Sequence, residues 1–279
     1  PMFLFAQQQK IQLLDFQTKK PLQFVELLYN NESVFSDKNG NVFIDFKDNK
    51  IEILDGNYKP NHIEISTNTE SIELENTVTE LEEIVISKKT RTIINPQKKN
   101  LWRFFYINSK ICVLNELIFN PEYQNKYLRK ISFKTLPELF FGTDLISHED
   151  IKKFKNSVQI LRVNVLDHNK KEIFTSDAFE FIPKKKSIFS VDIYEDVLLT
   201  NDPIFIEIQV LGSLDGSGTF LNKNITPSIR PELVKMKPKE YDVNVWFKYR
   251  NVEMDFKDYN KMNLYEGFIN FGFEFEDVD

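Results

Sequence analysis

A period of two in its apolar residues is the feature that most narrows what this chain can fold into. From 204 to 210 every second residue is Ile or Val, and side chains two apart on a strand point to the same face. Short runs of this kind recur from residue 11 to residue 275, separated by residues typical of turns. A hydrophobic fraction of 41% is enough to fill a packed core. The sequence therefore predicts an all-β protein with only minor helix.

The first third of the chain has the strand spacing of a small antiparallel β-sandwich. Ile51 and Ile53 share one face of a short strand, and residues 55–57 have the composition of a turn. The pair Asn39–Gly40 lies between two apolar runs, and both residue types accept positive φ. This pair predicts a tight β-hairpin. Such closely spaced strands, with no helix among them, favour two packed sheets.

Five motifs follow one another in this part of the chain: LD at 14–15, TKKPL at 18–22, SDKNG at 36–40, YKP at 58–60 and LEEIVIS at 81–87. Together they resemble the carboxypeptidase-regulatory-like domain, a transthyretin-like β-sandwich of seven strands that is common in envelope proteins of Bacteroidetes. One residue departs from the family pattern, because Asn57 stands where a glycine usually precedes the tyrosine. The resemblance implies a fold and a setting in the cell envelope, and no peptidase activity.

The chain start and a later basic segment suggest domain boundaries. Residues 2–6 are mostly apolar and end in Ala6 before three glutamines, which predicts that residues 1–6 are the remnant of a signal peptide, with an N-terminal strand as the alternative. Residues 7–87 then form the regulatory-like domain. Residues 88–100 are polar, contain Pro96 and carry a cluster of lysines and arginine, Lys88, Lys89, Arg91, Lys98 and Lys99. We interpret 88–100 as a solvated linker rather than a site for phosphate or anionic lipid.

Residues 101–279 predict a larger antiparallel β-sandwich, jelly-roll-like in the number and length of its strands. The order KISF, LRVNVLD, FSVDI, IFIEIQVL is loosely similar to the sandwich that follows the regulatory-like domain in some envelope proteins of Bacteroidetes. A short helix is expected over 147–156, with Ser147 as its N-cap. No segment has enough consecutive apolar residues to span a bilayer as a helix.

Charge and cysteine content bear on the compartment and the partners. The formal net charge is −6 with both signs interspersed, which gives no general drive toward nucleic acid or an anionic membrane. The single Cys112 has no partner for an internal disulfide and is expected to be a buried small apolar residue. We expect an exported protein of the periplasm, outer membrane or cell surface, not a membrane-spanning one.

No metal or cofactor is expected. The chain has three histidines, His62, His148 and His168, and neither His148–Glu149 nor His168 with Glu172 has a spacing that converges on zinc from strands or loops. Calcium prefers several carboxylates, and Asp215 stands apart from Asp196 and Asp202.

The sequence also gives little indication of nucleophilic or acid–base catalysis. The stretch GSLDGSGT at 212–219 places Ser213 and Ser217 at spacings that fit neither a serine nucleophile nor a phosphate-binding loop. We interpret it as a mobile connection after a strand. The lysines at 184–186 follow Pro183 and fit a solvated strand turn. With 42 acidic residues, the sequence neither indicates nor excludes a pair of carboxylates suited to glycoside hydrolysis.

The sequence therefore favours a non-catalytic envelope protein that binds a protein of the outer membrane or cell surface, with no catalytic residues assigned and the binding residues unknown. A carbohydrate-binding module is the first alternative, with Trp102, Trp246 and the tyrosines as aromatic candidates, although core packing is the preferred reading of both tryptophans. A hydrolase with an unrecognised acid pair is the second alternative.

Overall fold

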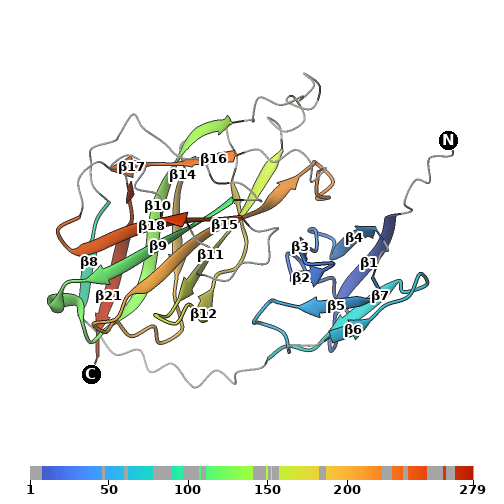
Figure 1. The fold of residues 1–279 in the computed structure, drawn as a ribbon, viewed down its shortest axis with the longest axis horizontal. Helices are drawn as coiled ribbons and strands as arrows, with labels where there is room; N and C mark the ends of the chain where they lie inside the picture. Colours follow the sequence, from blue (N-terminus) through green and yellow to red (C-terminus); the bar gives the residue numbers. More distant parts are fainter. Residues whose placement is uncertain are drawn as a thin grey trace. The chain divides into compact units, whose positions relative to one another are not determined.

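The computed structural model describes residues 8–45, 48–59, 62–77, 90–96, 107, 111–140, 149, 152, 157–181, 187–221, 228–234, 238–249, 260–261 and 268–278. The chain divides into two compact units (Figure 1). The first comprises residues 1–84 with short segments at 214–221 and 250–253, and the second comprises the rest. Regular structure in the described ranges is almost entirely β-strand, so the predicted all-β class is confirmed.

The first unit is a sandwich of two sheets. Its strands are β1 (Gln8–Asp15), β2 (Glu26–Tyr29), β3 (Glu32–Phe35), β4 (Asn41–Asp45), β5 (Lys50–Ile53), β6 (His62–Glu64) and β7 (Ser71–Leu74). One sheet has the order β4-β1-β7 and the other β3-β2-β5-β6. Alternate residues of both sheets, such as Leu13 and Leu27, are buried in one shared cluster. The predicted seven-stranded sandwich is therefore present.

One strand pair departs from the expected antiparallel pattern. β1 runs parallel to β7, with Gln12 opposite Ser71 and Asp15 opposite Leu74. A parallel pair needs a long connection, and these two strands are the first and last of the unit, so the intervening strands provide it. Sequence periodicity cannot reveal this, because period two is the same in both pairings.

The hairpin of this unit lies at a different place from the one predicted. Asn30 and Asn31 join β2 to β3 with φ of 52° and 60°, and positive φ at both positions is the geometry of a two-residue hairpin turn. The predicted hairpin at 39–40 is wrong, because β3 pairs with β2 while β4 pairs with β1. Gly40 is nevertheless required there, since its φ is 75° and an added Cβ would lie 2.8 Å from the Leu13 carbonyl oxygen.

Three loops, 37–41, 167–171 and 215–219, share one hydrogen-bonding arrangement. In each, the Oδ1 atom of the first aspartate accepts bonds from the backbone N–H groups two and four residues later. The two distances are 2.8 and 2.8 Å for Asp37, 2.8 and 2.9 Å for Asp167, and 2.8 and 3.1 Å for Asp215. The aspartate carboxylate thus satisfies backbone donors that the turn itself leaves without a partner.

The fourth residue of each of these loops is left-handed: Gly40, Lys170 and Gly218 have φ of 75°, 65° and 83°. A turn followed by a left-handed residue is a common three-residue connection between strands. The predicted connection at 212–219 begins later than expected. The preceding strand continues to Leu214, and 215–219 is a hydrogen-bonded turn.

The second unit stacks two larger sheets. The five-stranded sheet has the order β14-β10-β21-β8, with β16 also paired to β10, and the seven-stranded sheet has the order β12-β11-β15-β9-β18-β19, with β13 also paired to β11. A third pair, β17 with β20, is separate. The strands are β8 (Arg91–Ile94), β9 (Ile111–Phe119), β10 (Lys126–Phe140), β11 (Val158–Leu166), β12 (Glu172–Thr175), β13 (Phe179–Phe181), β14 (Ser187–Asp192), β15 (Ile204–Leu214), β16 (Ser228–Pro231), β17 (Leu233–Val234), β18 (Tyr241–Tyr249), β19 (Asn260–Lys261), β20 (Phe268–Ile269) and β21 (Gly272–Asp277).

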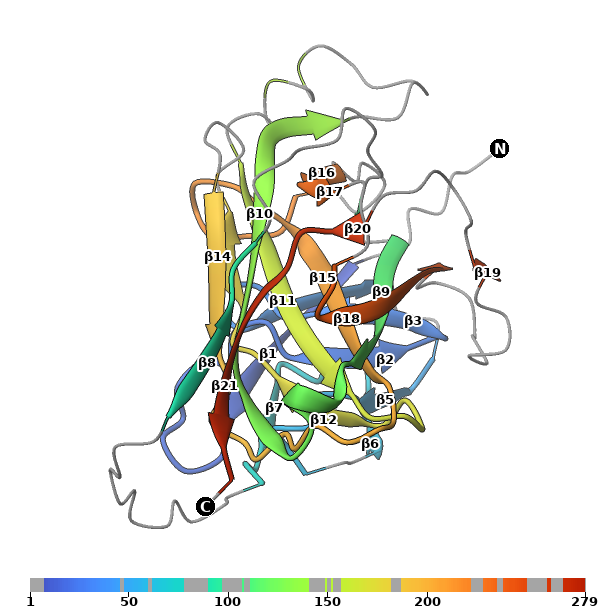
Figure 2. The same ribbon diagram turned by 90° about the vertical axis from the view of Figure 1, so that its left-hand side faces the viewer.

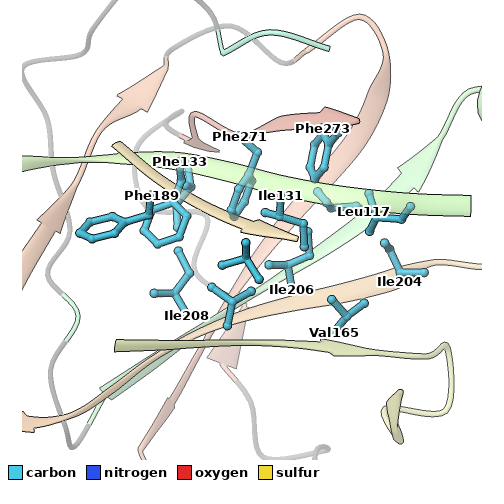
Figure 3. Close-up of a cluster of buried hydrophobic side chains, with 14 of the residues drawn as sticks. Leu117, Ile131, Phe133, Val165, Phe189, Ile204, Ile206, Ile208, Phe271 and Phe273 are labelled. Carbon is cyan, nitrogen blue, oxygen red and sulfur yellow. The ribbon is translucent and has the colours of Figure 1, made fainter. Parts of the chain in front are cut away.

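The core of this unit lies between the two sheets: Figure 2 shows the two layers of strands, and Figure 3 shows buried side chains between them. In Figure 2, β14, β8 and β21 lie to the left of β15, β9 and β18. Aromatic residues link the layers: the ring of Phe119 on β9 meets those of Phe273 and Phe275 on β21 at 5.1 and 5.3 Å, edge to face. Phe133 on β10 is fully buried. Each such side chain contributes about 1.5–3 kcal/mol by leaving water.

Two sequence predictions fall largely outside the described residues. The signal remnant at 1–6 is one, and the helix over 147–156 is the other, apart from Glu149 and Lys152, which are helical. A 3-10 turn, Pro121–Tyr123, follows β9. Within the segment 88–100 that we expected to be a linker, Arg91–Ile94 form β8 and pair antiparallel with β21.

Candidate functional site

The outer face of the five-stranded sheet is an ordinary charged surface. A row of alternating charges crosses β8, β21, β10 and β14: Arg91 lies 3.6 Å from Glu274, Glu274 lies 3.6 Å from Lys130, and Lys130 lies 3.1 Å from Asp192. The hydrogen bond to Asp192 is the main cause that raises the pKa of Lys130. Pairs of this kind, in contact with water, contribute about 0–1 kcal/mol each.

The outer face of the seven-stranded sheet is different, because polar side chains on it are buried. On β15, Ile206 and Ile208 point into the core, so Glu207 and Gln209 point to the opposite side, yet only 7% and 3% of these two residues is exposed. Glutamate is seldom buried unless it has a partner. From here on, "the outer face" without further qualification means this surface of the seven-stranded sheet. Its outward residues include Leu114, Glu116, Arg162, Asn164, Leu166, Phe205, Glu207, Gln209, Asn244 and Trp246.

Asn164 and Glu207 form the buried part of the outer face. The Asn164 side-chain N–H group donates a hydrogen bond of 2.8 Å to Glu207 Oε2, which joins β11 to β15. Asn164 is 5% exposed, and its Oδ1 atom accepts no hydrogen bond from any residue that the structure describes. A buried acceptor without a donor costs about 1–3 kcal/mol, so this atom is a local cost of burying Asn164 on this face.

Glu116 is the centre of the half-buried part, on β9 and β18. Its Oε2 atom accepts hydrogen bonds from the Asn244 side-chain amide at 3.0 Å and from the Trp246 indole N–H at 3.2 Å. Asn244 is directly opposite Glu116 in the β9–β18 register, and Trp246 is opposite Leu114. Both donors thus hold the same carboxylate oxygen, and within the described ranges no donor reaches Oε1.

An apolar cluster separates these two polar groups. Leu114, Leu166 and Phe205 are buried together, and Trp246 packs partly buried against them. The Lys170 ammonium, from the turn between β11 and β12, lies 5.2 Å from the Phe205 ring centre and 6.0 Å from that of Trp246. A cation at this distance is attracted by the ring faces. Aromatic rings, polar acceptors and a cation therefore share one face of the sheet.

The sequence candidates for carbohydrate stacking have different outcomes. Trp246, for which core packing was the preferred reading, packs on the outer face and not between the two sheets. Trp102 lies outside the described residues. The polar residues of the outer face were missed because burial on both sides of a strand cannot be read from periodicity. A signal was present in Arg162, Asn164, Glu207 and Gln209, which interrupt otherwise apolar strands.

The candidate metal ligands are dispersed. His62 is exposed on β6 and His168 is exposed in the turn after β11, while His148 lies outside the described residues. Among the residues described, no group of three His, Cys, Asp or Glu side chains is placed to hold a metal ion. Cys112 is fully buried beside Val113, as expected of a small apolar residue.

The remaining sequence candidates have structural roles. The Ser213 hydroxyl donates to Gln159 Oε1 at 2.7 Å, and the Ser217 hydroxyl donates to Asp215 Oδ1 at 2.6 Å. This last bond is the main cause that lowers the pKa of Asp215. Asp196 lies 2.9 Å from Arg129. In the basic segment, Arg91 pairs with Glu274.

The other lysines of that segment, Lys88, Lys89, Lys98 and Lys99, and the triple lysine at 184–186 lie outside the described residues. A helix that is long and apolar enough to cross a bilayer is not found in the part of the chain that the structure describes.

Comparison with known proteins gives little. No family model and no curated protein matches the sequence. Among solved structures, the chain is similar to the cysteine protease and lectin-like domains of Cwp84, a surface layer associated protein of Clostridium difficile. The identity is 10%, the TM-score is 0.37, and the match covers 88% of this chain and 46% of that one, so this chain spans about half its length. A similarity this low leaves the outer face to be judged on its own geometry.

Proposed function

We propose that this protein is a non-catalytic binding module of the bacterial cell envelope, exported to the periplasm, outer membrane or cell surface, and that it holds its ligand on the outer face. One observation carries the proposal: Glu116, Asn244 and Trp246 form a half-buried hydrogen-bonded group beside an apolar cluster, on a sheet face that would otherwise be expected to be charged and hydrated. The five-stranded sheet of the same unit provides that comparison, since its outer face carries a row of ion pairs whose side chains are 23–60% exposed.

Membership of the carboxypeptidase-regulatory-like family is part of this proposal for the first unit. Its support is the motif series at 14–60 together with seven strands in sheets of three and four. The SDKNG motif has a clear structural use, because Asp37 and Gly40 build the turn that passes from one sheet to the other. The family resemblance provides the envelope setting, and the second unit provides the binding face.

The alternative of a hydrolase with an acid pair has its best candidates on the same face. Glu207 is opposite Leu114 and Glu116 is opposite Phe205, so the two glutamates are diagonal neighbours on adjacent strands. In a glycosidase one carboxyl of the pair must donate a proton to the leaving group. Here one oxygen of each glutamate already accepts a bond from an amide or indole N–H, an arrangement that suits acceptors of a bound ligand. Binding is therefore the better-supported function.

The test is binding of the fluorescently labelled protein to isolated envelopes of the source bacterium. We expect saturable binding that Trp246→Ala weakens strongly. Tyr194→Ala is the matched control, because Tyr194 is an aromatic residue 82% exposed and does not belong to the outer face. The melting temperature of each variant establishes that it is folded. Binding that Trp246→Ala and Tyr194→Ala leave equally unaffected would refute the outer face as the binding site.

A further inference from the structure

We infer that the open edge of β14 is an interface for a second copy of this chain, so that two five-stranded sheets join into one continuous sheet across a twofold axis. This inference concerns a surface other than the outer face and does not depend on the proposed function. It rests on an unprotected strand edge, on backbone groups that point away from the sheet, and on charges that match when the strand meets its own copy.

β14 is the end strand of the five-stranded sheet, and no strand among the described residues pairs with its other side (Figure 2). Edge strands are usually protected by shortness, a proline, a bulge or charged side chains. The other end strands of the second unit are short: β8 and β12 have four residues each, β13 has three and β19 has two. β14 has six residues, contains no proline and pairs with β10 without a register shift. Its edge is therefore the one in this unit most open to pairing.

The outward side chains of β14 are accessible. Ile188 is 65% exposed, and Ser190 and Asp192 are exposed as well. Phe189 and Val191, between them, are buried in the core and hold the strand against the sheet. An exposed isoleucine on a long, unprotected edge strand favours association with another strand.

The hydrogen bonds to β10 determine which backbone groups of β14 point outward. The Ile193 N–H group donates to the Arg129 carbonyl at 2.8 Å, so every second residue back along the strand to 187 bonds to β10 in the regular antiparallel alternation. Lys134 on β10 is opposite Ile188, and its carbonyl accepts a bond of 2.8 Å from Glu232, which follows β16. The backbone groups of this intervening pair are thus directed away from each other.

Ile188, Ser190 and Asp192 therefore present their N–H and C=O groups to the open edge. A second β14 running antiparallel, with Ser190 opposite Ser190 of the partner subunit, pairs all of these groups at once. Ile188 then lies opposite Asp192 of the partner subunit, and the twofold axis repeats this pair. Serine is small, so the two copies can approach closely at the axis. The backbone bonds provide the affinity, as in other cases of strand addition at a sheet edge.

The charges at the two ends of this segment are opposite. Three lysines, 184–186, directly precede β14 in the sequence, and three residues span at most about 11 Å, so their charge stays near Ser187. Lys134 lies beside this end but is 3.9 Å from Glu232, so the lysines at 184–186 provide the net positive charge.

The other end of β14 is acidic. Five carboxylates and three cations meet around it: Asp192, Glu195, Asp196, Glu274 and Glu276 with Arg91, Arg129 and Lys130. Asp192 and Asp196 keep 51% and 69% of their side chains exposed despite their ion pairs. Antiparallel pairing brings this acidic end to the basic end of the second copy, twice across the axis, whereas parallel pairing would bring like charges together. The segment is therefore complementary to itself.

The test is the molar mass of the full chain by analytical ultracentrifugation over a wide range of concentration. We expect a reversible rise from 33.1 kDa toward twice that mass. Ser190→Pro removes an N–H group that points away from β10, a position where an edge strand tolerates proline, and should weaken the dimer by about a hundredfold or more. Ser190→Ala keeps the N–H group and should leave the dimer unchanged. The melting temperature of each variant establishes that it is folded.

A charge exchange tests the antiparallel arrangement. Glu195→Lys and Lys185→Glu should each weaken the dimer by about tenfold, because each removes an attraction that the axis repeats. The double variant restores opposite charges at the two ends and should recover most of the affinity. A double variant weaker than either single variant would overturn the antiparallel arrangement.

The remaining outcomes decide the partner. A chain that is monomeric at every concentration, or a dimer that Ser190→Pro leaves as stable as before, would overturn the inference. A monomeric chain whose binding to isolated envelopes is abolished by Ser190→Pro would overturn it in favour of a strand from another protein. None of these results bears on Trp246→Ala, so the proposed function of the outer face stands or fails separately.

Discussion

Substitution of Asp37 by alanine tests how much a buried turn carboxylate contributes to the first unit. Asp37 is fully buried, and its Oδ1 atom accepts backbone hydrogen bonds of 2.8 Å from Asn39 and from Asn41. Alanine removes the carboxylate acceptor, so the backbone N–H groups of Asn39 and Asn41 lose this hydrogen-bond partner. Because 37–41 connects the two sheets of the sandwich, we expect the whole unit to be destabilised, and not the loop alone.

The magnitude follows from the burial of the two donors. A hydrogen bond to a charged group contributes about 1.5–3 kcal/mol, and a buried donor left without a partner costs a similar amount. Asn41 is 7% exposed, so its N–H bears that cost in full. Asn39 is exposed, so its N–H can bond to water and loses less. Together we expect Asp37→Ala to lower the free energy of unfolding by about 2–4 kcal/mol.

Hydrogen exchange by mass spectrometry is the appropriate assay. Both tryptophans, Trp102 and Trp246, belong to the second unit, so tryptophan fluorescence does not report on the first. Exchange is followed in peptides from 8–45 and 48–59. A loss of 2–4 kcal/mol increases the population of the open state by about thirtyfold to a thousandfold, which exchange rates resolve. Peptides from 157–181 serve as the internal reference.

The same hydrogen bonds in an exposed loop provide the control. Asp167 accepts bonds of 2.8 and 2.9 Å from Asn169 and Lys171, but both bonds lie near water. We expect Asp167→Ala to cost about 0.5–1 kcal/mol, because water replaces the lost acceptor. Asp37→Asn, which keeps an oxygen acceptor, should cost less than Asp37→Ala. Equal losses for Asp37→Ala and Asp167→Ala would refute the argument that burial decides the effect.

Three further substitutions test local geometry. Gly272→Ala should destabilise the second unit by about 1–3 kcal/mol in urea unfolding, because its Cβ would lie 2.6 Å from Pro96 Cδ; an unchanged midpoint would contradict that contact. Asn31→Gly should raise the stability of the first unit by about 0.5 kcal/mol in hydrogen exchange, since φ is 60° there, and a loss would argue against the turn. The pKa of Asp215 is lowered, so its contribution is present above 3.8 and lost as pH falls further. Asp215→Asn should reduce the acid dependence of thermal unfolding, and an unchanged dependence would assign it to other carboxyls.

The strands of the second unit show what periodicity can predict. Alternation from 204 to 210 places Ile206 and Ile208 in the core, as the structure does. It also marks Glu207 and Gln209 as facing the other way, and they do. Periodicity carries no information on whether that other face is exposed. The burial of Glu207 and Gln209 depends on which parts of the folded chain lie near them, and alternation along one strand does not predict this.

Residue types predict where turns occur, but they do not predict which strands each turn connects. Asn30–Asn31 and Asn39–Gly40 have similar composition, yet only the first closes a hairpin between paired strands. Both turns accommodate positive φ, which is a local property of the backbone. Whether the next strand returns to the same sheet or crosses to the other depends on the packing of both sheets around their shared core. The parallel pairing of β1 with β7 has the same origin.

By itself the sequence determined the strand content, the seven-stranded first unit and the inward faces, because hydrophobic burial acts on each strand according to its own alternation. Tertiary structure alone decided that Asn164, Glu207, Glu116 and Trp246 share one surface. These residues come from four strands between positions 116 and 246, and hydrogen-bonded register across the sheet, which no local pattern encodes, brings them together.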